Sequence, residues 1–280
     1  MSRNFWRKFS GNRAAVVSLY FIGAVSVLAL LAPLVTHFSY QEQHILQRLQ
    51  TPNSTHWMGT DNLGRDLYSR IIYGARMSLS VGIFTALFAL FVGTFFGAVA
   101  GYFGGWVDRL LMRVVDLFYI FPSLLLAILL MLLLGRGFMG IFIALGMTAW
   151  VTQARLVRGQ VLQAREMSYV EAARAVGVQN FAIILRHILP NLLGPIIVSL
   201  TVQIPAAIMA ESFLSFLGLG IQPPFSSWGT LASEGFRAMQ SYPHLIVFPG
   251  GILFLTMLAF NYLGDGLRDV LDPHTKRELA

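Results

Sequence analysis

Six stretches of this 280-residue chain contain no charged residue, and each is long enough to form a helix that spans a bilayer, which needs ~20 apolar residues. They cover residues 14–36, 77–107, 117–135, 137–154, 187–210 and 238–264. Unpaired backbone polar groups are costly in lipid, so long apolar segments of this kind form helices there. We therefore expect an all-α integral membrane protein with six transmembrane helices.

The composition supports a membrane protein and excludes a soluble globular domain. Hydrophobic residues make up 56% of the chain and charged residues only 12%, about half of the usual charged share. The net charge of +7 does not indicate nucleic-acid binding, because the basic residues form no long run. The first apolar stretch exceeds the ~7 to 15 residues of a signal-peptide core, so we interpret it as an uncleaved helix.

The distribution of basic residues predicts the orientation of the six helices. With a cytoplasmic N-terminus, 14 of the 20 Lys and Arg residues lie on the inside, as the positive-inside bias requires. The other six are Arg48, Arg65, Arg70, Arg76, Arg136 and Arg237. This arrangement places both termini in the cytoplasm, residues 37–76 outside, and a tight external hairpin at Gly135–Gly140.

The chain shows no internal repeat and no interdomain linker, so we expect one membrane domain in two parts. Residues 1–76 contain the N-terminal cytoplasmic tail, the first transmembrane helix and an external segment. Residues 77–280 form a five-helix core that contains a cytoplasmic loop at about residues 155–191.

Three glycines in the second apolar stretch predict a close helix contact. Gly93, Gly97 and Gly101 recur every fourth residue and therefore share one face of a helix. Small residues at this spacing allow the backbones of two membrane helices to approach each other. We expect this face to be buried against another helix, in this chain or in a partner.

The residues needed for catalysis, for a cofactor or for a metal site do not occur in a recognisable pattern. A phosphate-binding G-x-x-x-x-G-K-[ST] loop is impossible, because the only lysines, Lys8 and Lys276, precede Phe9 and Arg277. The chain has no cysteine, and its six histidines show no metal-ligand spacing. We therefore predict no catalytic residue, no cofactor and no metal, and any coupling to ATP must come from a partner.

Glu211 is the one acidic residue in the fifth apolar region, near its predicted outer end. An intramembrane carboxylate is a candidate for a substrate or ion pathway. A carboxylate close to the interface can also be hydrated or pair with Ser212 or a neighbouring helix. The sequence leaves both interpretations open.

The cytoplasmic loop at about residues 155–191 is patterned as two helices joined by a glycine bend. Ser168 and Glu171 form an S-x-x-E capping box, which predicts a helix from Tyr169. Gly177 stands where a helix end favours a left-handed residue, and Asn180 can cap a second helix that ends before Pro190.

The two helices of this loop are predicted to have different partners. In the second, residues 181, 184, 185 and 188 are apolar at helical spacing, which suits packing on the membrane domain. In the first, Glu171, Ala172 and Ala173 form a small surface that can enter a cleft of another protein. The capping function of Glu171 is compatible with this contact.

The loop resembles the EAA signature of ABC importer permeases, E-A-A-x-x-x-G followed after nine residues by I-x-L-P. The matching residues are Glu171, Ala172, Ala173, Gly177, Leu189 and Pro190. His187 stands where the signature has an apolar residue. The resemblance implies that these residues form the loop that couples the permease to its ATPases.

Further motifs resemble the dipeptide/oligopeptide (peptide/nickel) branch of these permeases, and in particular its C-type subunit. They cover nearly the whole chain, at residues 59–61, 64–66, 73–76, 101–105, 216–220, 222–224 and 264–269. The resemblance implies a type I ABC importer permease fold in a bacterial cytoplasmic (inner) membrane.

The implied function is that of a non-catalytic subunit that forms half of a translocation path for di- or oligopeptides. Its implied partners are a second, B-type permease, two ATP-binding subunits and an external peptide-binding protein, besides membrane lipid. Nickel and glutathione importers of the same branch are alternatives. An ion-coupled secondary transporter fits less well, because it would need several intramembrane carboxylates and only Glu211 qualifies.

Overall fold

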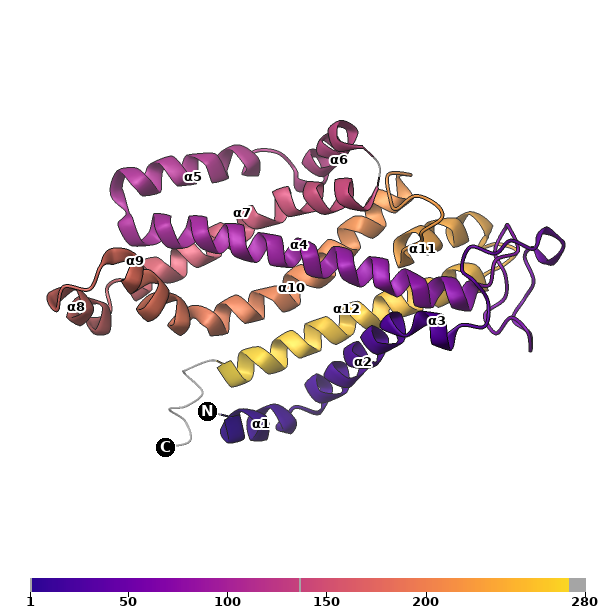
Figure 1. Ribbon diagram of the computed structural model, residues 1–280, viewed down its shortest axis with the longest axis horizontal. Helices are drawn as coiled ribbons and strands as arrows, with labels where there is room; N and C mark the ends of the chain where they lie inside the picture. Colours follow the sequence, from indigo (N-terminus) through magenta and orange to yellow (C-terminus); the bar gives the residue numbers. More distant parts are fainter. Residues whose placement is uncertain (1, 136, 272–280) are drawn as a thin grey trace.

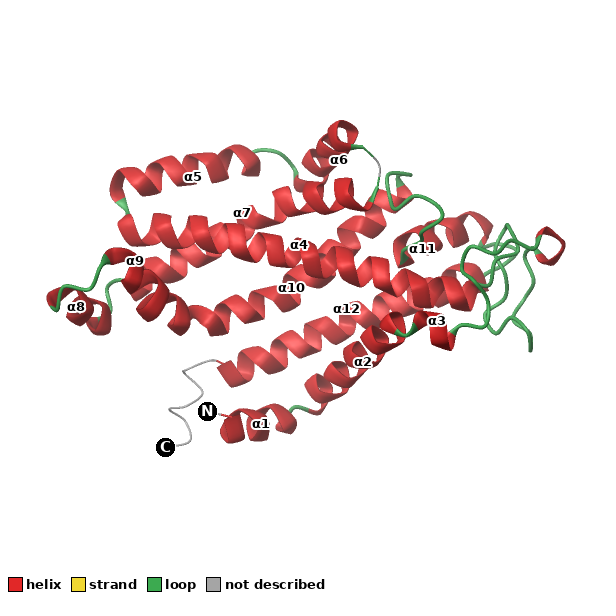
Figure 2. Ribbon diagram, in the orientation of Figure 1, coloured by secondary structure: helices red, strands yellow, loops and turns green. Residues whose placement is uncertain are grey.

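The computed structural model describes residues 2–135 and 137–271, and every regular element in these ranges is a helix (Figures 1 and 2). The prediction of an all-α fold is thus confirmed. The helices are α1 (Ser2–Gly11), α2 (Arg13–Leu30), α3 (Ala32–Val35), the 3₁₀ turn η1 (Ile45–Gln47), α4 (Leu67–Phe103), α5 (Gly105–Tyr119), α6 (Ser123–Leu134), α7 (Phe138–Ala164), α8 (Ser168–Ala175), α9 (Asn180–Ile183), the π-helical turn η2 (Ile184–Ile188), α10 (Leu189–Phe216), α11 (Trp228–Ala238) and α12 (His244–Leu271).

Five helical segments in the described part of the chain are long and apolar enough to cross a membrane. They are α2, α4, α7, the continuous segment Asn180–Phe216 that ends with α10, and α12. The α5–α6 pair supplies a sixth span only if the two helices are counted together, since they are bent by 84°. The prediction of one helical span over residues 117–135 is therefore wrong in its geometry.

The break between α5 and α6 lies at Pro122. Proline lacks the backbone donor that a continuous helix needs, and it disfavours helical geometry at the preceding residue, Phe121. The α6 helix has 12 residues, or about 18 Å at 1.5 Å per residue, which is too short to cross a bilayer alone. The amphipathic α5 is tied to α7, because Asp108 accepts two hydrogen bonds of 2.6 Å from Arg158.

The glycine face of α4 packs against α7. A Cβ atom at Gly93 would lie 2.7 Å from the carbonyl oxygen of Trp150, and one at Gly101 would lie 2.9 Å from that of Arg158. Only hydrogen side chains permit this approach of the two backbones. The predicted close contact is confirmed, and its partner lies within this chain.

The helices run mainly along the long axis of the molecule and separate two ends (Figure 1). The α8 helix lies at the left end of Figure 1, and α1 and the last turns of α12 lie in the lower part of the same half. The opposite end contains most of the non-helical chain between α3 and α4. The turn predicted at Gly135–Gly140 is shorter than expected, because α7 already begins at Phe138, and Arg136 lies outside the described residues.

The predicted division after residue 76 falls inside α4, which is continuous from Leu67. Asp66 caps this helix, since its side chain accepts a 2.8 Å hydrogen bond from the backbone N–H of Ser69. The helix has 37 residues, so it extends for about 55 Å and its first turns rise beyond the apolar stretch.

Candidate functional site

The loop between α7 and α10, together with the first turn of α10, contains the EAA-like residues that the sequence singled out. The α7 helix continues to Ala164, so the part of the predicted loop that lies outside α7 is shorter than expected. After α8, the backbone N–H of Gly177 donates to the carbonyl of Arg174 at 3.0 Å, and that of Val178 donates to Ala173 at 3.1 Å. These two bonds form a Schellman motif. Gly177 has φ +80°, as predicted for a left-handed residue.

The capping residues of the loop differ from the prediction. The α8 helix begins at Ser168, one residue early, and Met167 precedes it without a side-chain cap, so the expected capping box is not formed. Asn180 is the first residue of α9, and Gln179 precedes it. The side chain of Asn180 instead accepts a 2.9 Å hydrogen bond from the hydroxyl of Tyr102.

The α8 helix has a buried face and an exposed face. Val170 and Ala173 are buried, whereas Glu171 and Ala172 are exposed. Ala173 therefore does not belong to the small exposed surface that was expected of the Glu171–Ala173 run. Val176, at the end of the hairpin, is 79% exposed and adds an apolar side chain to that surface.

The buried face of α8 joins a core that includes parts of α4, α7 and α10, which we call the coupling core. Its buried members are Ala98, Tyr102, Val157, Val161, Ala164, Val170, Ala173, Ile183, Ile184, Ile188, Leu192 and Ile196. The buried face of α8 is therefore part of the same close-packed core as three long helices.

The second helix of the loop does not end before Pro190. It passes through the π-helical turn η2 into α10. Pro190 is the second residue of α10, a position at which its missing backbone N–H costs no helical hydrogen bond. The extra residue of a π turn shifts the faces of the helix. Ile184 and Ile188 are buried as predicted, but Phe181 and Leu185 are 58% and 62% exposed.

Leu189 and Pro190 lie at the start of α10 and differ in their contacts. Leu189 is partly buried and packs against the coupling core, so it shares that core with Ala173. Pro190 is exposed, as are Glu171 and Ala172. The structure thus brings the EAA-like residues into one hairpin but divides them between its core and its surface.

Tyr102 connects this hairpin to α4, and it is not among the site residues predicted from the sequence. Its ring is 6% exposed, its hydroxyl donates to Asn180, and the guanidinium of Arg174 lies 5.2 Å from its centroid. The signal was present, since Tyr102 lies in the Gly101–Gly105 motif. The partners of Tyr102, which lie more than 70 positions away, could not be read from that motif.

Glu211 lies at the other end of α10 and is fully buried in this chain. Its Oε1 atom accepts hydrogen bonds from Ser215 at 2.8 Å and from Ser227 at 2.7 Å. Of the possible partners that the sequence left open, Ser212 is not one, because its hydroxyl donates to the carbonyl of Ile208. Glu211 therefore joins α10 to the first residues of α11, which Ser227 caps.

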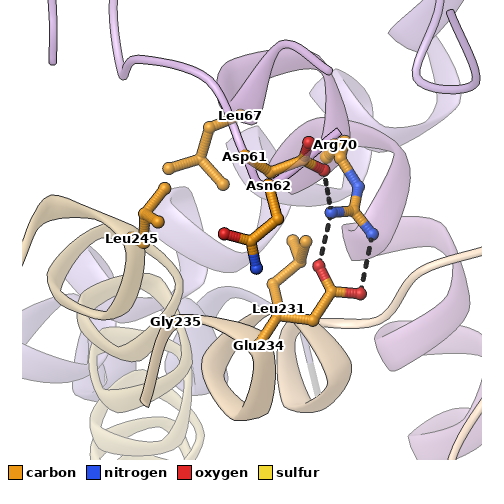
Figure 3. Close-up of a pocket in the computed structure, with 8 residues that line it drawn as sticks. All are labelled: Asp61, Asn62, Leu67, Arg70, Leu231, Glu234, Gly235 and Leu245. Carbon is orange, nitrogen blue, oxygen red and sulfur yellow. Dashed lines mark hydrogen bonds and ion pairs between the residues drawn. The ribbon is translucent and has the colours of Figure 1, made fainter. Parts of the chain in front are cut away.

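The end of the molecule near α11 also contains a buried charged cluster (Figure 3). Asp61 and Glu234 both accept hydrogen bonds from Nη1 of Arg70, at 2.5 and 2.6 Å, and Asp61 accepts another from Arg65. Arg70 is only 2% exposed. Removal of one partner from a buried ion pair is strongly destabilising, so the cluster joins α11 to α4 and to the segment before it.

The family comparison covers most of the chain in two parts. Residues 93–277 match the family described as binding-protein-dependent transport system inner membrane component. Residues 1–52 match the N-terminal transmembrane domain of oligopeptide transport permease C.

Curated relatives match the chain over nearly its full length. The dipeptide transport system permease protein DppC of Bacillus subtilis (strain 168) is 46% identical over 99% of this chain and 87% of its own length. The oligopeptide transport system permease protein OppC of Escherichia coli (strain K12) is 44% identical over 97% and 92%. The glutathione transport system permease protein GsiD of Pectobacterium atrosepticum is 41% identical over 98% and 91%.

Solved structures support the fold. An inward-facing structure of the MetNI methionine ABC transporter has a TM-score of 0.60 and 16% identity, over 72% of this chain and 95% of that one. A second ABC transporter of amino acids has a TM-score of 0.54 and 18% identity, over 72% and 92%. The helical arrangement is that of a type I importer permease, and the chain belongs to the family of binding-protein-dependent transport system inner membrane components.

Proposed function

We propose that the chain is the C-type permease subunit of an ATP-driven importer of di- or oligopeptides. The observation that carries this proposal is the hairpin of α8 and Gly177, whose outer face is exposed and whose inner face is part of the coupling core. The names of relatives at 41–46% identity support a peptide substrate.

In this function the exposed face of α8 enters a groove of an ATPase subunit. Closure of the ATPase pair displaces α8, and the coupling core passes the displacement to α4, α7 and α10. The permease thereby changes between inward-facing and outward-facing states. The chain performs no hydrolysis itself, and a second permease of the B type forms the other half of the path.

An external binding protein delivers the peptide in this proposal, and the chain lies in the bacterial inner membrane. Glutathione is a second candidate substrate, because the GsiD relative is 41% identical over nearly the full length. We retain the division into residues 1–76, with the tail, the first span and the external segment, and the permease core of residues 77–280.

The functional test is reconstitution of this chain with its second permease, both ATPases and the binding protein in proteoliposomes. We expect uptake of labelled dipeptide that requires ATP and the binding protein. Uptake that persists without ATP and follows an ion gradient would indicate a secondary transporter instead.

The proposed orientation predicts the location of reporter domains fused along the chain. Fusions after Thr36 and Phe225 should be external, while fusions after Arg165 and at Ala280 should be cytoplasmic, because of the basic residues on that side. Paired reporters that are active on opposite sides of the membrane measure this. An external reporter after Arg165 would contradict the orientation.

Glu211 is retained as a proposed residue of the translocation path, and a Glu211→Gln variant tests this. The glutamine oxygen can still accept the hydrogen bonds of Ser215 and Ser227, so we expect an unchanged protein level. Loss of the ionisable carboxyl group is expected to lower uptake. Total uptake and the amount of inserted protein are both measured. If the two fall by the same factor, Glu211 has a structural role only.

A further inference from the structure

The N-terminal helix α1 separates aromatic and basic side chains. Phe5, Trp6 and Phe9 lie within about 100° of arc around the helix axis, and their ring centroids are 5.9–6.1 Å apart. Arg7 lies on the opposite side of the helix, and Lys8 lies beside the aromatic arc, about 60° from Phe5. Strong segregation of this kind is typical of helices that lie in a membrane interface.

The helix is held beside the end of α12 and is not a continuation of α2. Phe9 is 2% exposed, and a Cβ atom at Gly266 of α12 would lie 3.5 Å from its ring. Asn12 separates the two helices, since its extended backbone and its side chain cap α2 at the N–H of Ala15. Phe9 thus packs against the last turns of α12, whereas Trp6 is 57% exposed.

The charge of this region favours an anionic partner. The first acidic residue of the chain is Glu42, so the segment that contains Arg7, Lys8 and Arg13 is purely basic. Among the described residues, none of these three side chains takes part in an ion pair. Cytoplasmic leaflets carry anionic lipids, and tryptophan is enriched at the membrane interface.

We propose that α1 lies in the cytoplasmic leaflet interface and binds the head groups of anionic phospholipids. Trp6 enters the boundary with the acyl chains, and Arg7 and Lys8 contact the lipid phosphates. The proposal assigns the chain a lipid-binding element that is separate from the coupling hairpin. It rests on the proposed cytoplasmic N-terminus.

The test uses the full-length chain in the assembled importer, embedded in nanodiscs. The chain has no cysteine, so Ser10→Cys provides a single site in it for an environment-sensitive fluorophore next to the helix face. We expect the label to be more shielded from iodide in bilayers with 30% phosphatidylglycerol than in pure phosphatidylcholine. Mass spectrometry of the retained lipids should show enrichment of phosphatidylglycerol.

The variant Arg7→Gln with Lys8→Gln is expected to lower this enrichment at least fivefold, because each cation near an anionic surface contributes about 1 kcal/mol. The matched control is Arg48→Gln with Arg237→Gln, which removes two exposed cations from the opposite end and should leave the shielding unchanged. Inorganic phosphate added to phosphatidylcholine nanodiscs should not reproduce the shielding.

Equal shielding in both lipids, or an unchanged enrichment in the Arg7 and Lys8 variant, would overturn the proposal. Shielding by phosphate alone would also overturn it, since the site would then recognise a free anion. Failure of peptide uptake in reconstituted wild-type importer would contradict the proposed function without affecting these lipid measurements.

Discussion

A Gly177→Val variant is expected to lose peptide uptake while its insertion into the membrane remains normal. Gly177 has φ +80°, and a Cβ atom there would have no neighbour within 4 Å, so backbone strain is the main effect. Left-handed geometry costs an L-residue roughly 1–2 kcal/mol, and a β-branched residue more. This is enough to reduce the population of the Schellman hairpin by about 5- to 30-fold.

The matched control is Gly177→Asn, because asparagine tolerates left-handed geometry far better than valine. It should keep most of the uptake. Pull-down of the ATPases from detergent extract measures their attachment to the permease. Peptide-dependent ATP hydrolysis in proteoliposomes measures the coupling. Equal coupling in both variants would show that the bend at Gly177 does not position α8.

A companion variant tests the exposed surface of the same hairpin. Glu171→Lys with Ala172→Leu changes two exposed side chains and leaves the buried Ala173 in place. We expect weaker attachment of the ATPases and no loss of folded protein. A change at Ala173 would not test docking, because it would overpack the coupling core.

A Gly97→Leu variant is expected to yield little folded protein. A Cβ atom at Gly97 would lie 2.9 Å from the backbone nitrogen of Arg158, and the helix backbone there cannot withdraw as a flexible side chain can. Overpacking of a core costs ~1–3 kcal/mol, and a clash with a backbone belongs at the upper end. We expect the α4 and α7 helices to move apart.

The control for this variant is Gly23→Leu in α2, where a Cβ atom would have no neighbour within 4 Å. Its yield should resemble that of the unchanged chain. Fluorescence-detected size-exclusion chromatography and thermal stability in detergent measure both variants. A normal Tm for Gly97→Leu would mean that the two helices can move apart at little cost.

The number and position of the apolar spans could be predicted, because the bilayer imposes a minimum length on any helix that crosses it. The third span shows where this reasoning stops. Hydropathy located its apolar residues, but it did not predict that Pro122 would divide them into α5 and α6 with an 84° bend. A hydropathy average carries no information on the direction of the chain after a break.

The faces of the helix that follows Gly177 show a second limit. Helical spacing identified Ile184 and Ile188 as buried, but it assumed 3.6 residues per turn throughout. The buried face instead includes Ile183, so Phe181 and Leu185 are exposed, and the π turn at residues 184–188 breaks the period further along. Sequence periodicity can predict a face only while the helix remains regular.

The sequence by itself determined what depends on local geometry and on the solvent: a helical membrane protein, a glycine face on α4, and a left-handed bend at Gly177. Only the tertiary structure decided which side chains are buried together. Ala173 faces the coupling core, Tyr102 holds Asn180, and Glu211 joins Ser227. These contacts join residues on separate segments of the chain, and their partners are set by the packing of whole helices rather than by any local pattern.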